Sequence, residues 1–147
     1  MSIKIFYDEV KFRLGRSREI KRFLQKVIRD EKKIPGDLNF IFTSDHKLLE
    51  INKEFLKHDY FTDVIAFENN RDDLINGEIY ISVETVKRNS RLYSVKTEDE
   101  FARVMIHSVL HLCGYSDKSE SLRKIMIKKQ ELLTERLTGG RESGLQL

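Results

Sequence analysis

At 147 residues the chain is long enough for one domain with its own hydrophobic core. Charged residues make up 35% of it and hydrophobic residues 39%, which is ordinary for a soluble globular protein. No apolar run approaches the roughly 20 residues that a membrane span needs, so we expect no membrane segment.

The N-terminus and the cysteine content indicate the compartment. Residues 1–7 alternate as in a strand and lack the long apolar core of a signal peptide. Cys113 is the single cysteine and cannot form a disulfide within the chain, which fits a reducing cytosol. We expect a cytoplasmic protein.

The N-terminal half is predicted to mix strands and helices. Alternation over residues 3–7 predicts a first strand. Apolar residues three and four positions apart predict a helix from Arg18 to Arg29, with its basic residues facing outward. Pro35-Gly36 is expected to interrupt the chain before a second strand over residues 38–42.

The remaining strands precede a helical C-terminal half. Ser44-Asp45 is a typical helix start and predicts a short helix through Phe55. Residues 64–67 and 77–82 predict two further strands. Three helices are then predicted, over residues 83–92, 97–113 and 119–137. Thr97 to Glu100 has the form of a capping box that would start the middle one of these.

These elements predict a single α+β domain over residues 1–137, with a small four-stranded mixed sheet and about five helices. Residues 138–147 contain two adjacent glycines and little to bury, so we expect a disordered tail.

A histidine pair predicts a metal site. His107 and His111 are four residues apart, so both imidazoles project from the same face of a helix, about 40° apart. Gly114 ends that helix and lets the chain fold back to deliver the carboxylate of Asp117. Two imidazoles and one carboxylate make a zinc site with the fourth position open, as in catalytic zinc sites.

Other interpretations of this segment remain open. Asp117 could instead cap the following helix, and Glu120 is a rival third ligand. The Cys113 thiol is a conceivable ligand, although a buried thiol at a helix end is the more common case. The residue after His107 is Ser108, where helical zinc peptidases carry a glutamate base. Water activation would therefore come mainly from the metal.

Basic residues gather in two segments. Lys11 to Lys33 contains ten basic and three acidic residues, and a second cluster runs from Arg123 to Lys129. Beside a hydrolytic metal, such clusters favour a polyanion with phosphodiester bonds as substrate. The residues predicted to bind RNA are Arg16, Arg18, Lys21, Arg22, Arg123 and Lys124.

Three blocks, over residues 51–67, 77–82 and 107–115, occur in an order that resembles the YbeY family of bacterial metal-dependent endoribonucleases. The resemblance covers roughly residues 38–135. It implies a zincin-like fold with a mostly parallel sheet and one antiparallel edge. It also implies one zinc ion, a single-stranded rRNA precursor as substrate, and a role in biogenesis of the small ribosomal subunit.

The chain departs from the family pattern at two important positions. The third ligand of the family is a histidine, where this chain has Asp117, itself a competent zinc ligand. Leu56 stands in place of an arginine associated with RNA cleavage. The neighbouring Lys57 and His58 are the candidates to replace that arginine in catalysis.

The leading hypothesis is therefore a zinc-dependent endoribonuclease that acts in rRNA 3′-end maturation. One alternative is a non-catalytic, zinc-containing ribosome-assembly factor, in which Leu56 marks the loss of catalysis. The other is a metal-dependent hydrolase of another substrate. The missing glutamate base argues against a peptidase, and the basic clusters favour a polyanion.

Overall fold

The computed structural model describes residues 2–56 and 62–146, with side chains described up to residue 139. Over these residues four strands and five helices follow one another in the order β1, α1, β2, α2, β3, β4, α3, α4 and α5. The mixture confirms the predicted α+β class.

The four strands form one mixed sheet. They are β1 (Ile3–Tyr7), β2 (Ile34–Thr43), β3 (Val64–Glu68) and β4 (Leu74–Ser82). Their order in the sheet is β1-β2-β4-β3. The first three strands of this order run parallel, whereas β3 pairs antiparallel with β4 and forms one edge. The sheet therefore has the single antiparallel edge that the family resemblance implied.

The second strand begins earlier than predicted. β2 starts at Ile34, so Pro35-Gly36 lies inside the strand and does not interrupt it. The pairing with β4 changes register between Pro35 and Leu38. Such an irregularity tolerates a residue that lacks a backbone N–H, which explains why the proline does not end the strand.

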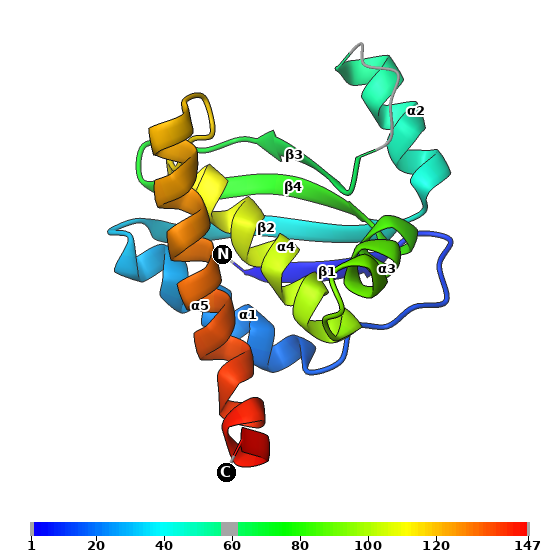
Figure 1. Cartoon of the computed structure of the whole chain (residues 1–147). Coiled ribbons are helices and arrows are strands. Elements are labelled where there is room, and N and C mark those ends of the chain that lie inside the picture. Colours follow the sequence, from blue (N-terminus) through cyan, green and yellow to red (C-terminus); the bar gives the residue numbers. More distant parts are fainter. Residues whose placement is uncertain (1, 57–61, 147) are drawn as a thin grey trace.

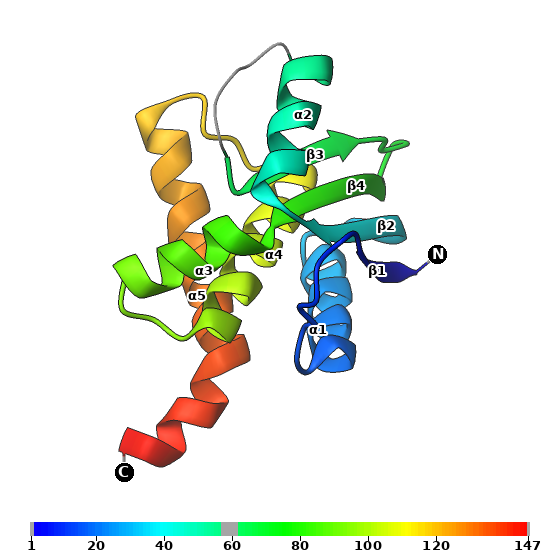
Figure 2. The same ribbon diagram turned by 90° about the vertical axis from the view of Figure 1, so that its right-hand side faces the viewer.

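Helices cover the two faces of the sheet unequally. The helices are α1 (Ser17–Asp30), α2 (Asp45–Phe55), α3 (Val83–Leu92), α4 (Thr97–Leu112) and α5 (Glu120–Gln146). Figures 1 and 2 show α1, α4 and α5 gathered together, with α2 standing apart from them near β3. Leu48 and Ile51 of α2 form a small separate apolar cluster with Ile65 of β3.

Helix α4 is the central element of the main core. Phe101 of α4 is fully buried and lies 4.4 Å from the ring centroid of Phe12 and 5.6 Å from that of Phe42. Met105, Ile106 and further apolar residues of α4 are also buried against the sheet. The helix is therefore held on its apolar side along most of its length.

The capping box predicted at the start of α4 is wrong. Lys96 is the N-cap residue, so Thr97 already lies within the helix and cannot cap it. The Thr97 hydroxyl lies 3.1 Å from Ser90 Oγ, and the Glu100 carboxylate pairs with Arg103 at 2.6 Å. A contact with α3 holds Thr97 and an ion pair within α4 holds Glu100, so neither side chain makes the predicted cap.

The end of α4 follows the prediction. Gly114 has a φ of +113°, a left-handed conformation that favours glycine. The backbone N–H of Tyr115 donates to Leu110 O at 3.1 Å and closes the helix end. Asn70, from the turn between β3 and β4, donates its side-chain amide to Leu112 O at 2.9 Å. This end of the helix is thereby tied to the sheet.

Ser119 caps helix α5, since the Leu122 N–H donates to its Oγ at 3.1 Å. This bond supplies the cap that Asp117 was considered for. We expected α5 to end at Leu137 and a disordered tail to begin at Thr138. The helix instead continues to Gln146, and Thr138 is buried with its hydroxyl donated to Thr134 O at 2.8 Å.

Within residues 2–56 and 62–146, no helix is both long and apolar enough to cross a membrane.

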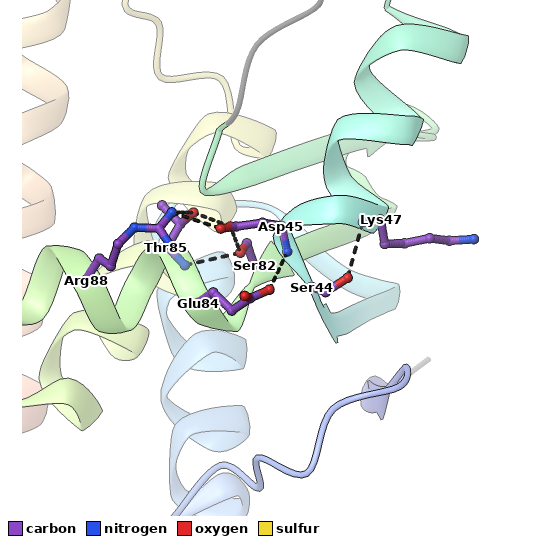
Figure 3. A network of polar contacts seen from close by, with 7 residues as sticks. All are labelled: Ser44, Asp45, Lys47, Ser82, Glu84, Thr85 and Arg88. Carbon is purple, nitrogen blue, oxygen red and sulfur yellow. Dashed lines mark hydrogen bonds and ion pairs between the residues drawn. The ribbon is translucent and has the colours of Figure 1, made fainter.

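Asp45 joins the starts of α2 and α3, as Figure 3 shows. Its carboxylate accepts hydrogen bonds from the Ser82 and Thr85 hydroxyls, and from Arg88 at 2.9 Å. Its backbone N–H donates to Glu84 Oε1 at 2.9 Å. Burial acts to raise the pKa of Asp45, but the three hydrogen bonds outweigh burial and leave this pKa below its ordinary 3.8.

We expect Asp45→Asn to lower the free energy of unfolding by about 1 to 3 kcal/mol at pH 7, because it weakens charge-assisted bonds at a mostly buried site. The folded-state pKa is depressed, so the stabilisation is fully present above pH 3.8 and is lost as the pH falls through the lower folded-state value. Urea unfolding of both proteins at pH 7 and at pH 2 measures this.

The matched control is Asp30→Asn, which removes an exposed carboxylate paired with Lys26. We expect a much smaller change there, since exposed ion pairs contribute little. Equal losses in the two variants would contradict a special role for Asp45.

Candidate functional site

The histidine pair lies on the face of α4 that turns away from the core. His107 is half-buried and His111 is exposed, while the neighbouring Val104 and Ser108 are buried. The Ser108 hydroxyl donates to Val104 O at 2.9 Å within the helix. Ser108 is therefore turned into the helix backbone, in agreement with the expectation that it provides no base.

A cavity of about 150 Å³ lies beside His107. Glu100, Arg103 and His107 line it from α4, Asp63 lines it from the residue before β3, and Gln130 lines it from α5. The three α4 residues are spaced three and four positions apart, so they share one helix face with His111. The cavity thus joins the antiparallel edge of the sheet to the histidine face of α4.

Gln130 holds one nitrogen of the His107 ring. Gln130 Oε1 lies 2.6 Å from His107 Nδ1, and the side chain of Gln130 is buried. Because this contact uses Nδ1, the second ring nitrogen, Nε2, remains available to a ligand. Metal-binding histidines commonly have one nitrogen engaged in this way.

Arg103 connects the two helices that flank the cavity. Its Nε donates to Glu131 Oε2 of α5 at 3.0 Å, and one terminal nitrogen donates to Glu100 Oε1 at 2.6 Å. Burial raises the pKa of Glu100, and Arg103 opposes that rise. The guanidinium carries a permanent positive charge and has N–H groups beyond these two.

Asp117 does not join the histidines in a closed site. Among the residues that the structure describes, no three His, Cys, Asp or Glu side chains lie close enough together to hold a metal ion. Asp117 is exposed on the connection between α4 and α5, within which Ser116 Oγ accepts the Lys118 N–H at 3.1 Å. The three-ligand set of His107, His111 and Asp117 therefore stays a prediction.

The rival ligands Glu120 and Cys113 both have contacts of their own. Glu120 lies in the first turn of α5, 3.5 Å from Lys124 Nζ. Cys113 packs against the main core. Burial, and next the Glu31 carboxylate, raise the pKa of the Cys113 thiol to about 12. The thiol is then protonated at neutral pH and behaves as a small core residue.

The residues predicted to bind RNA lie in two places. Arg16 is the N-cap of α1 and pairs with Glu19, while Arg18, Lys21 and Arg22 lie on α1. Arg123 and Lys124 lie in the first turns of α5 and are exposed. Leu56 is the exposed C-cap of α2. Lys57 and His58 lie outside the described residues, so their predicted catalytic role stays a prediction.

Sequence reasoning missed several residues of the cavity. Glu100 and Arg103 could have been found, because they precede His107 by seven and four residues and so share its helix face. Gln130 carries no such signal, since 23 residues separate it from His107 and only the packing of α5 on α4 brings it close.

Comparison with known proteins agrees with this architecture. A family model described as Endoribonuclease YbeY matches residues 6–138. The Endoribonuclease YbeY of Christiangramia forsetii is 40% identical over 126 residues, which cover 86% of this chain and 88% of that protein. That of Flavobacterium psychrophilum is 43% identical, with 86% and 90% covered.

A solved structure is also similar. The solution structure of a Thermotoga maritima protein matches with a TM-score of 0.68 and 30% identity, over 97% of this chain and 93% of that one. Fold, motif order and extended sequence identity agree with one another, and the chain belongs to the YbeY family of endoribonucleases.

Proposed function

We propose that this protein is a zinc-dependent endoribonuclease that cleaves single-stranded rRNA precursor in the cytoplasm during biogenesis of the small ribosomal subunit. The observation that supports it most is the histidine pair on one face of α4, beside a polar cavity that contains the Arg103 guanidinium. Family membership supports RNA as the substrate.

The donor chemistry of the histidine pair suits a single divalent cation. His107 and His111 offer imidazole nitrogens from adjacent turns, and the contact with Gln130 leaves Nε2 of His107 available. Asp117 lies on the connection that follows Gly114 and would supply the third ligand from there. When bound, the ion would polarise a phosphoryl oxygen and lower the pKa of a water molecule to about 7.

Arg103 is suited to bind the phosphodiester next to these ligands. Two of its five N–H groups are used by Glu131 and Glu100, so further donors remain for phosphate oxygens. The two carboxylates hold the guanidinium in one place, which reduces the entropy lost when it binds a phosphate. Arg103 can therefore provide a planar cation in place of the family arginine whose position Leu56 occupies in this chain.

A groove between α1 and α5 is suited to bind the rest of the RNA chain. It measures about 510 Å³ and is lined by Arg22, Lys26 and Arg29 of α1 and by Arg136 of α5. Lys26 pairs with Asp30 at 2.9 Å, whereas none of the three arginines forms an ion pair with a described residue. Three arginines from two helices, without ion-pair partners in the part of the chain that the structure describes, are suited to bind the phosphate backbone.

We expect His111→Ala to abolish RNA cleavage and to leave RNA binding within about threefold of wild type, since the histidine acts through the metal and the basic residues bind the backbone. The measurement is cleavage of a single-stranded rRNA 3′-end precursor with and without chelator, together with fluorescence anisotropy for binding. His46→Ala, which alters an exposed histidine paired with Glu50, is the matched control and should keep full activity.

Cleavage that survives both chelation and His111→Ala would contradict the metal-dependent mechanism. Binding without cleavage by metal-loaded wild type would instead support the assembly-factor alternative.

We expect the triple variant Arg22→Gln, Arg29→Gln and Arg136→Gln to weaken RNA binding and to lower the slope of log K against log salt by about 2, at roughly 0.7 per lost phosphate contact. The rate at saturating RNA should not change. Lys47→Gln, Arg71→Gln and Arg91→Gln remove equal charge from other exposed sites and form the control. Equal slopes in the two triple variants would show that the groove does not bind RNA.

A further inference from the structure

Gln130 is the one polar side chain from outside α4 that the structure hydrogen-bonds to a histidine of the pair, among the residues described. It lies in the middle of α5, is 9% exposed, and places Oε1 2.6 Å from His107 Nδ1. A short, buried contact between an amide and an imidazole restricts both partners, because rotation of either would leave a polar atom unpaired.

The chemistry of the amide sets the direction of this hydrogen bond. An amide oxygen only accepts, so His107 Nδ1 must carry the hydrogen. In a neutral imidazole the other nitrogen, Nε2, then has a lone pair and no hydrogen. That tautomer is the one in which Nε2 can bind a cation.

A second contact fixes which way the amide faces. Gln130 Nε2 donates to Glu131 Oε2 at 3.2 Å. Were the amide reversed, its oxygen would face this carboxylate and two acceptors would oppose each other. Glu131 Oε2 is itself held by Arg103 Nε at 3.0 Å.

These contacts form a continuous chain between α4 and α5. It runs from Glu100 through Arg103, Glu131 and Gln130 to His107. Glu100 is buried, so one end of the chain is anchored in the protein interior. The orientation of the His107 ring therefore depends on the docking of α5.

We propose that Gln130 is a positioning residue of the candidate metal centre: it fixes the tautomer and the ring orientation of His107 so that Nε2 points to the cation. The part concerning the cation rests on the proposed function, whereas the tautomer can be measured without metal or RNA. Loss of such partners typically weakens metal binding about 10- to 100-fold.

The first test is the His107 tautomer in metal-free protein, read from ring nitrogen shifts in two-bond ¹H–¹⁵N spectra at pH 8. Wild type should show hydrogen on Nδ1. Gln130→Met keeps an unbranched side chain without the acceptor, and should shift His107 toward hydrogen on Nε2; Gln130→Leu serves if that variant does not fold. Gln130→Glu loses the donor to Glu131 but retains the acceptor for Nδ1, and should keep the hydrogen of His107 on Nδ1.

The second test is zinc affinity, measured by competition with a chromogenic chelator. Gln130→Met should bind zinc about 10- to 100-fold more weakly than wild type. Gln130→Glu should bind zinc more tightly than Gln130→Met does, because it keeps an acceptor for His107 Nδ1, although it loses the donor to Glu131. Thr134→Val is the matched control, since it removes a buried hydroxyl one turn further along α5 that donates to Gln130 O.

The positioning role of Gln130 and the metal-dependent function would be overturned by different results. An unchanged tautomer in a folded Gln130→Met protein, or an affinity loss equal to that of Thr134→Val, would overturn the positioning role. A wild-type protein that shows the expected tautomer but binds no zinc would overturn the metal-dependent function, while the tautomer result would still support Gln130 as the residue that orients His107.

Discussion

Helix α4 has to be apolar on one side and polar on the other over nearly its full length. Its apolar side carries Phe101, Met105 and Ile106, which are inaccessible to solvent. Its other side carries Arg103 and His107 into the cavity. Since both sides belong to one rigid helix, the packing of the core sets where the histidines lie. The elements around α4 must bury its apolar side and also provide hydrogen-bond partners for its polar side.

Helix α5 provides hydrogen-bond partners for the polar side of α4. Burying Glu100 and the ring of His107 without partners would be costly, and α5 provides Glu131 and Gln130 across the interface. The same helix contributes Leu133 to the core. One element thus completes the hydrophobic packing and orients a candidate ligand, so the fold and the site of this YbeY-family protein are built from the same contacts.

Local patterns predicted the elements well and their long-range contacts poorly. Alternation located β1, capping residues located α2, and the predicted third helix coincides with α3 over Val83–Leu92. The capping box at Thr97 failed because Ser90 and Arg103 bind its side chains instead. The histidine pair could be recognised from its spacing alone. The network around it could not, because it depends on how α5 docks onto α4.

Helix α2 is held both at its first residue and along its apolar face, where Leu48 and Ile51 pack with Ile65 of β3. Its first residue, Asp45, is bonded to the start of α3, and its last turn carries the exposed Phe55 and Leu56. An 11-residue helix is roughly 16 Å long, so the polar contacts at Asp45 and the ring contact at Phe55 hold it at opposite ends. The direction of α2 over the sheet is therefore set jointly by a carboxylate network at its start and by apolar packing along its face.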